Sequence, residues 1–118
     1  MNEQLPPPLT PAVFHILLAL AGRERHGYEI MQQVRRDSQG QVKMGNGTLY
    51  GALKRMLADD LIADAGDRVE PDDERRKYYR LTARGRRALA AEMRRYEAVA
   101  TLLRQRGLGS DLARGRAR

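Results

Sequence analysis

The sequence predicts a mainly α-helical fold with a small β-wing, that is, a winged helix-turn-helix followed by one long C-terminal helix. Three observations predict it. Three short segments have helical hydrophobic spacing, two strand-like segments flank a charged loop, and a long last segment has heptad spacing. The chain has 118 residues, of which 42% are hydrophobic and 31% charged, so it is long enough for one globular core.

The first two helices have start signals in the sequence. Thr10 can cap the amides of a first helix and Pro11 loses no hydrogen bond at its first position, so we expect a helix over residues 11–21. After a short polar turn in which His26 has a capping or hydrogen-bonding role, a second helix is expected over residues 27–37. Its apolar face comprises Tyr28, Ile30, Met31 and Val34.

A turn and a third helix follow. Residues 38–40 form the turn, and Val42 is placed in a very short strand. The third helix is predicted over residues 48–60, because apolar side chains recur at helical spacing at Leu49, Ala52, Leu53, Met56 and Leu57. The opposite face then presents only small, hydroxyl-bearing and cationic residues, namely Gly47, Thr48, Tyr50, Gly51, Lys54 and Arg55.

This outer face of the third helix is suited to DNA. Between residues 41 and 56 the only charged side chains are Lys43, Lys54 and Arg55, and all three are positive. Lysine and arginine neutralise phosphates or reach guanine edges, and hydroxyl groups hold phosphate oxygens. The alternative is a short basic face that meets only solvent.

The wing is expected to consist of strands over residues 61–67 and 77–81, joined by an acidic loop at residues 70–74. Tyr79 and Leu81 share one face of the second strand, and Tyr79 is predicted to lie in the core. Tyr78 points the other way, so we expect it to touch DNA or to be exposed.

The last helix is predicted over residues 83–106, with Thr82 as its cap, and its length of about 36 Å exceeds what so small a domain can cover. An apolar stripe with heptad spacing runs along it through Leu89, Met93, Tyr96, Ala100 and Leu103. The stripe either packs on the chain's own first helix or forms the seam of a homodimer, and we expect the seam. Tyr96 is also a candidate for ligand binding.

The two ends of the chain are expected to be flexible, as an arm over residues 1–9 and a basic tail over residues 107–118, which leaves residues 10–82 as the DNA-binding domain. The net charge of +7 arises entirely within residues 83–118, and residues 1–82 carry 12 basic and 12 acidic side chains. A basic C-terminal segment fits an acidic partner such as nucleic acid, and it fits equally well a feature that keeps the protein soluble.

Several other classes of protein are disfavoured. The chain has no cysteine and two isolated histidines, so no metal site is expected. Its acidic pairs lie in loops without a predicted pocket, so we expect no catalytic residue, no enzymatic activity and no cofactor. No signal peptide or bilayer-spanning segment is apparent, which favours a cytoplasmic protein without a membrane partner.

Three motifs, in this order and spacing, resemble the PadR family of transcriptional regulators. They are HGYEI at 26–30, GTLY at 47–50 with LKRML at 53–57, and RRKYYRLT at 75–82 followed by Gly85. The resemblance covers about residues 10–106. It implies a winged helix-turn-helix repressor that binds DNA as a homodimer through its C-terminal helix and often releases DNA when a small aromatic or drug-like ligand binds. The single C-terminal helix is similar to that of the compact subgroup.

The resemblance also assigns roles to particular residues. It places Thr48, Tyr50, Lys54 and Arg55 in the recognition helix, and it places Arg75, Arg76 and Lys77 in a basic wing. Two departures stand out: Gly51 occupies a position where the family commonly has proline, and an acidic run at residues 70–74 precedes the wing motif. Insertion of the wing into a minor groove is therefore less well supported than docking of the third helix in a major groove.

The sequence thus predicts a homodimeric, sequence-specific transcriptional regulator that acts as a repressor on a palindromic operator, with double-stranded DNA and a second copy of itself as partners. Its activity as a repressor is implied by the resemblance alone. Two alternatives stay open: a winged-helix module that binds a protein, and a ligand-binding dimer that does not bind DNA.

Overall fold

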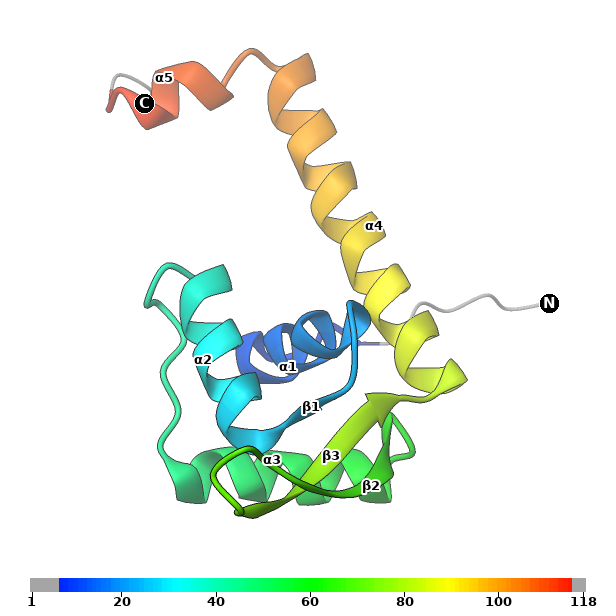
Figure 1. Ribbon diagram of the computed structural model, residues 1–118. Helices are drawn as coiled ribbons and strands as arrows, with labels where there is room; N and C mark the ends of the chain where they lie inside the picture. Colours follow the sequence, from blue (N-terminus) through cyan, green and yellow to red (C-terminus); the bar gives the residue numbers. More distant parts are fainter. Residues whose placement is uncertain (1–6, 116–118) are drawn as a thin grey trace, which may run out of the picture.

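The computed structural model describes residues 7–115, and it has the predicted fold class (Figure 1). In chain order the elements are α1 (Pro11–Ala21), β1 (Arg25–His26), α2 (Gly27–Asp37), α3 (Asn46–Ala58), β2 (Ile62–Val69), β3 (Arg75–Leu81), α4 (Ala83–Gln105) and α5 (Gly109–Ala113). Most of the arm predicted over residues 1–9 lies outside the described residues. None of the described helices is long and apolar enough to cross a membrane.

The first two helices have the predicted bounds because their caps are in place. The hydroxyl oxygen of Thr10 accepts the Val13 amide at 3.2 Å at the start of α1. At the start of α2, Nδ1 of His26 accepts the Glu29 amide at 3.4 Å while the Glu29 carboxylate accepts the His26 amide at 3.2 Å. This reciprocal pair is a capping box, and it confirms the capping role predicted for His26.

The third helix is shifted from its predicted position. α3 begins at Asn46 rather than residue 48, with Gly45 as its cap, and it ends at Ala58 because Asp60 adopts a positive φ of 59°. The short strand predicted at Val42 is wrong. The amide of Val42 is held by the Ser38 hydroxyl at 2.9 Å, so this segment is a side-chain-stabilised bend with no strand partner.

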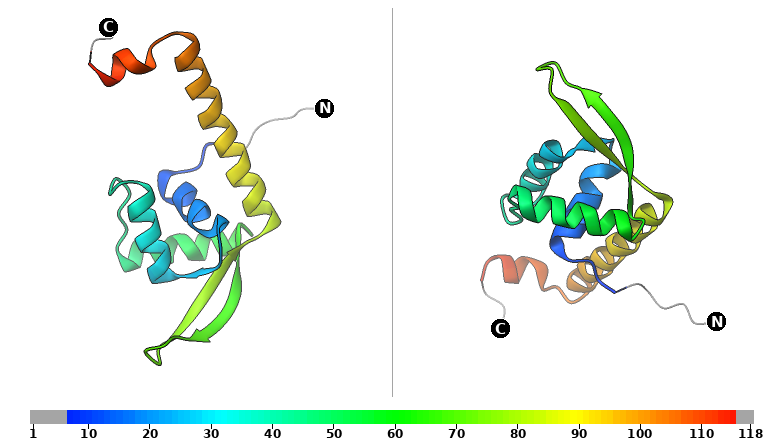
Figure 2. Two further views of the ribbon diagram at one scale, coloured as in Figure 1. Left: turned by 45° about the horizontal axis from the view of Figure 1, so that its top comes forward. Right: turned by 90° about the horizontal axis from the view of Figure 1, so that it is seen from below.

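The wing is a longer hairpin than predicted, and its sheet has a third strand. β2 and β3 extend by two residues each toward the loop, and the sheet order is β1-β3-β2 with all pairs antiparallel. A bulge interrupts the pairing between Asp64 and Asp67, where Gly66 has a φ of 92°. Figure 2 shows the hairpin projecting beyond the helices, beside α3. The two-residue strand β1, predicted as part of a turn, pairs with Tyr78 and Tyr79 of β3.

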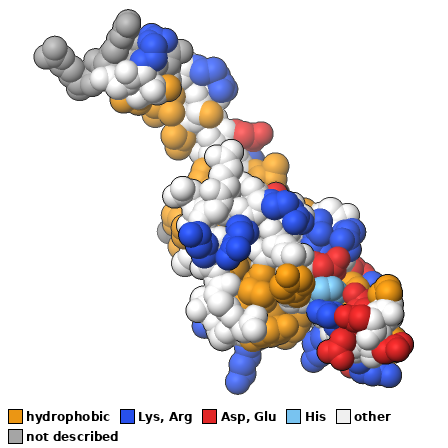
Figure 3. Space-filling model, turned by 60° about the vertical axis from the view of Figure 1, so that its left-hand side comes forward, with side chains coloured by type: hydrophobic (Ala, Val, Ile, Leu, Met, Phe, Trp, Pro, Cys, Tyr) orange, Lys and Arg blue, Asp and Glu red, His pale blue; other side chains and the backbone are white. Residues whose placement is uncertain are grey.

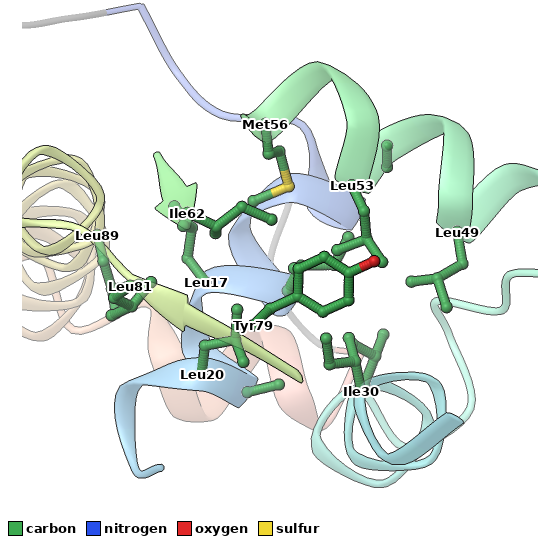
Figure 4. Close-up of a cluster of buried hydrophobic side chains, with 14 residues drawn as sticks. Leu17, Leu20, Ile30, Leu49, Leu53, Met56, Ile62, Tyr79, Leu81 and Leu89 are labelled. Atoms are coloured by element: carbon green, nitrogen blue, oxygen red, sulfur yellow. The ribbon is translucent and has the colours of Figure 1, made fainter. Parts of the chain in front are cut away.

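The core lies between the three helices and the sheet (Figure 4). Its largest fully buried side chains come from four elements: Ile16, Leu17, Ile30, Val34, Leu49, Leu53, Met56 and Ile62. Tyr79 is 5% exposed and belongs to this core, as predicted. Because α3 buries its apolar face here, its opposite face is left in solvent.

α4 starts on the core and then leaves it. Gly85 packs directly against the backbone of Leu61, the residue before β2. A Cβ at this position would lie 2.0 Å from the carbonyl oxygen of Leu61. Further along, α4 projects away from the domain (Figure 1), and the Cα radius of gyration is 17.1 Å, against about 13 Å for a compact domain of this length. Within the tail predicted to be flexible, α5 forms a helix of five residues.

Candidate nucleic-acid interface

The solvent face of α3 is the first part of the candidate interface. The side chains of Thr48, Tyr50, Lys54 and Arg55 are exposed there, as the helical spacing predicts, and Tyr50 is 50% exposed. The guanidinium of Arg55 lies over Gly51, since a Cβ at Gly51 would be 3.6 Å from Nη1 of Arg55. The described part of this helix carries no acidic side chain, so its outer face can offer only hydroxyl groups and positive charge to a ligand.

α3 packs against the start of α2 where the Tyr50 side chain contacts Gly27. A Cβ at Gly27 would lie 2.4 Å from the hydroxyl oxygen of Tyr50, so the tyrosine ring occupies the space that a side chain at Gly27 would need. This contact fixes the orientation of Tyr50 at the edge of the exposed face. The sequence motif containing Gly27 therefore positions a residue of a different motif.

A hollow of about 260 Å³ opens between α3, the start of α2 and the first residues of β3. It brings together predicted residues from both motifs, because Tyr50 lies on one side and the three cations of the wing lie on the other. Its lining consists of His26, Gly27, Tyr28, Tyr50, Glu74, Arg75, Arg76 and Lys77. Three cations, two tyrosines and the first amides of a helix are groups that hold phosphate oxygens.

The wing cations differ in how strongly their charge is already balanced. The Nη2 atom of Arg76 lies 3.2 Å from a carboxylate oxygen of Asp72, and Nζ of Lys77 lies 3.5 Å from one of Asp64. Arg75 makes no ion pair with any residue that the structure describes. The amides of Gly66 and Glu74 donate to Asp64 and Asp72 respectively, and together with the neighbouring cations they hold the pKa of both carboxyls below the usual range.

The prediction that Tyr78 is exposed or touches DNA is wrong. Tyr78 is 8% exposed, because side chains of the neighbouring strands and of the wing loop, His26, Arg68 and Glu70, pack around it. Its hydroxyl donates to the Glu70 carboxylate at 3.0 Å, its ring meets the His26 ring edge-on with 5.3 Å between centroids, and Arg68 lies 4.0 Å over it. Burial, followed by the Glu70 carboxylate, raises the pKa of Tyr78. Tyr78 therefore anchors the hairpin to α2.

Lys43 lies apart from the wing cations and lines a second hollow of about 160 Å³. The other residues that line this hollow are Tyr28, Met31, Gln32, Arg35 and Met44. Tyr28 borders both hollows and is 53% exposed, so its predicted place on the apolar face of α2 is wrong. At 100° per residue Tyr28 lies about 160° from Ile30, and Arg35 falls on the same side as Tyr28. Helical geometry applied residue by residue would have placed Tyr28 and Arg35 together on the surface of α2.

The predicted seam on α4 divides into a covered and an open part. Leu89 is 6% exposed and packs in the chain's own core, so it is not free for a partner. Met93 and Tyr96 are 45% and 50% exposed, and Ala100 and Leu103 are partly buried. Tyr96 also meets the ring of Phe14 on α1 edge-on, with 5.0 Å between centroids.

Glu92, on the same helix, was not predicted from the sequence. It is 3% exposed, it accepts the Leu9 amide at 3.3 Å, and it pairs with Arg95 at 2.7 Å. It thus ties the segment before α1 to α4. A glutamate between two alanines and a methionine gives no sequence signal for this role.

Figure 3 shows how charged side chains are distributed over the face of the molecule that includes α2. Basic side chains are spread over the helical part, whereas acidic side chains gather with basic ones at the hairpin. Among the described residues, no group of three or more His, Cys, Asp or Glu side chains is arranged to hold a metal ion. The features of this candidate interface are therefore the cations and hydroxyl groups of α3 and of the hollow beside it.

Comparison with known proteins identifies the family. Residues 16–91 match the PadR-like family of transcriptional regulators. The transcriptional regulator Rv3488 of Mycobacterium tuberculosis is 36% identical over 86 residues, which are 73% of this chain and 76% of that protein. A PadR family transcription regulator of Clostridium difficile has a similar structure, with a TM-score of 0.69 and 30% identity over 81% of this chain and 97% of that one.

A third likeness concerns the fold alone. Bacillus subtilis PadR, solved in complex with operator DNA, has a TM-score of 0.58 and 22% identity, over 66% of this chain and 44% of that one. The family match covers more than half of the chain and includes all three of the motifs that indicated it. The chain belongs to the PadR-like family of transcriptional regulators.

Proposed function

We propose that this protein represses transcription as a homodimer that binds a palindromic operator through α3. Residues 10–82 act as the DNA-binding domain and residues 83–106 as the dimerisation helix. In a two-fold dimer, the two copies of α3 enter successive major grooves about 34 Å apart, and occupation of the operator blocks transcription. The observation that carries the proposal is the outer face of α3, which has hydroxyl groups and cations and no acid.

The surroundings of α3 support the proposal. Lys54 and Arg55 are exposed and can reach base edges or phosphates, and the hollow beside Tyr50 faces the same side as the wing cations. The related Bacillus subtilis PadR was solved with operator DNA, which agrees with this assignment of a ligand. Much of the binding free energy would come from neutralised phosphates, so affinity should fall steeply as the salt concentration rises.

The test is the double variant Lys54→Ala with Arg55→Ala. An operator is first obtained by selecting bound duplexes from a random pool, and affinities are then measured by fluorescence anisotropy. We expect the variant to bind the selected duplex about a hundredfold more weakly, because two contacts of roughly tenfold each are lost. Its thermal unfolding should match that of the parent, since both side chains are exposed.

A matched control removes the same charge elsewhere. Arg87 and Arg94 are exposed on α4 and lie about 160–180° around the helix from Tyr96, away from the seam. The double variant Arg87→Ala with Arg94→Ala should retain most of the affinity. If both pairs weakened binding equally, net charge rather than α3 would carry recognition. If the pool enriched no duplex, the protein-interaction alternative would be favoured.

Homodimerisation has its own support and its own test. Beyond the core, one side of α4 exposes Met93, Tyr96 and Val99, which are 45%, 50% and 55% exposed and lie within about 120° around the helix, and such an apolar stripe on a projecting helix favours a partner. Met93→Glu with Val99→Glu should give monomers in analytical ultracentrifugation without loss of the fold. The same charges placed at Arg87 and Arg94 should leave the dimer intact. A dimer that survived the first pair would contradict the seam.

Release by a small hydrophobic effector is the last element of the proposal. The edge-on contact of Tyr96 with Phe14, at the open part of the stripe, offers aromatic surface to such a molecule. Screening aromatic and drug-like compounds against the complex of parent protein and operator tests this directly. Tyr96→Ala should abolish the response to any compound that releases the parent, and a response that persisted would place the effector elsewhere.

A further inference from the structure

We propose that two acids of the wing, Asp72 and Asp64, compete with DNA phosphates for the wing's own cations and so limit what the wing adds to DNA affinity. This inference rests on the proposed function, because it concerns the strength of a DNA contact. It makes Asp72 and Asp64 determinants of affinity that act by holding Arg76 and Lys77.

The charge of the hairpin is the first observation. Residues 62–81 carry six acids and five bases, a net charge of −1 in a protein whose total is +7. A wing that bound phosphates strongly would be expected to have the opposite sign. The α3 segment differs sharply, because Lys54 and Arg55 are its only charged side chains.

The second observation is which side chains are paired. The Arg76–Asp72 pair is 3.2 Å apart with side chains 32% and 57% exposed, and the Lys77–Asp64 pair is 3.5 Å apart with side chains 50% and 52% exposed. Both pairs border the face where the hollow opens, since Arg76 and Lys77 line it. Two of the three wing cations that line the hollow, Arg76 and Lys77, are therefore already paired with acids in the free protein.

Solvent exposure determines how these pairs respond to DNA. Exposed ion pairs are weak, so a phosphate can take the cation from its carboxylate. The carboxylate nevertheless stays attached to the same hairpin, within a few ångström of the incoming phosphate, and two like charges at that distance repel. Each acid therefore reduces the gain from a phosphate contact without abolishing it.

The test is Asp72→Asn, which removes the charge and keeps an oxygen that can accept the Glu74 amide, now 3.0 Å from Asp72. The matched control is Asp73→Asn. Asp73 is the next residue, it is exposed, its side chain makes no ion pair or hydrogen bond with the described residues, and asparagine tolerates its φ of 65°. Both variants raise the net charge by one, but only Asp72→Asn frees Arg76.

We expect Asp72→Asn to bind the selected duplex about threefold to fivefold more tightly than the parent at low salt, in line with the strength of one exposed pair. The plot of log affinity against log salt concentration should steepen by about 0.9, since one more cation then neutralises a phosphate fully. Asp73→Asn should change both quantities clearly less. In an Arg76→Gln background, Asp72→Asn should give no more than the Asp73→Asn effect.

Two outcomes overturn the inference while the proposed function stands. The first is equal tightening by Asp72→Asn and Asp73→Asn, which would reflect net charge alone. The second is an Asp72→Asn effect that persists without Arg76. Failure of the parent and of every variant to bind any duplex would instead refute the proposed function, and with it this inference.

Discussion

Gly85 provides a sharp test of how α4 is attached to the domain. A Cβ at this position would lie 2.0 Å from the carbonyl oxygen of Leu61 and 3.0 Å from its carbonyl carbon. Ordinary contacts between carbon and oxygen are about 3.3 Å or longer. Gly85→Ala therefore requires the first turn of α4 to move by more than 1 Å from a backbone carbonyl, which cannot rotate away as a side chain can.

The cost follows from what holds α4 at this point. The amide of Thr82 donates to the same Leu61 carbonyl at 3.2 Å, and the Thr82 hydroxyl donates to the Asp60 carbonyl at 2.6 Å. Overpacking costs about 1–3 kcal/mol and each weakened hydrogen bond about 1 kcal/mol, whereas alanine gains about 1 kcal/mol of helix propensity over glycine. We expect a net loss of about 3 kcal/mol in the free energy of unfolding.

Urea denaturation followed by circular dichroism measures this loss. Gly51→Ala is the matched control, because a Cβ there meets only Nη1 of Arg55 at 3.6 Å, and the same helix-propensity gain should stabilise the protein by up to about 1 kcal/mol. The two identical substitutions should thus have opposite signs. Equal stability of Gly85→Ala and the parent would refute the close approach of α4 to Leu61.

Two further substitutions test the α2 start. Gly27→Ala should leave the unfolding free energy nearly unchanged, because the half-exposed Tyr50 ring can swing out, but should weaken operator binding about tenfold in anisotropy titrations, the worth of one hydrogen bond to a charged group. Burial raises the pKa of Glu29, but the Arg23 and His26-amide hydrogen bonds outweigh it and leave this pKa below its usual value. Stability from this carboxylate is therefore present above the unfolded pKa and lost as the pH falls through the folded one. Glu29→Gln should cost about 0.5 kcal/mol at pH 7 and remove that acid-side loss in melting curves from pH 3 to 7.

The elements best predicted from the sequence are those with local start signals. α1 and α2 have the predicted bounds because Thr10 and His26 cap them through their own neighbours. α3 has no such side-chain cap: Gly45 precedes it and makes no side-chain hydrogen bond. Its start was therefore misplaced by two residues. Its buried and exposed faces agree with the predicted spacing except at Leu57, which was placed on the apolar face and is 36% exposed.

The errors at the wing have a tertiary origin. Alternation along β3 indicated two faces, with Tyr79 in the core and Tyr78 in solvent or on DNA. The missed strand β1 lies beside β3 and places His26 next to Tyr78 on that second face, where Tyr78 is buried against His26 and Glu70. Two residues are too few to give a period-2 pattern. No local signal could have shown that the second face of the wing is occupied.

The division of α4 into a covered and an open part likewise could not be predicted from the heptad stripe. Leu89 and Met93 are one helical turn apart and equally apolar, yet one is 6% and the other 45% exposed. The difference depends on where the domain ends beneath the helix, which is set by the contacts at Gly85 and Glu92. Both contacts involve partners more than 20 residues away in sequence.

The same two contacts connect the stability of the fold to the proposed recognition of DNA. α4 has 23 residues and is about 34 Å long, so a 10° tilt at its base displaces its far end by about 6 Å. That displacement exceeds the rise of about 3.4 Å per base step along a DNA strand. If two copies meet along α4, the seat of Gly85 on Leu61 and the tie from Glu92 to Leu9 fix the distance between the two α3 helices. The half-site spacing would then be set by residues that touch neither DNA nor the partner.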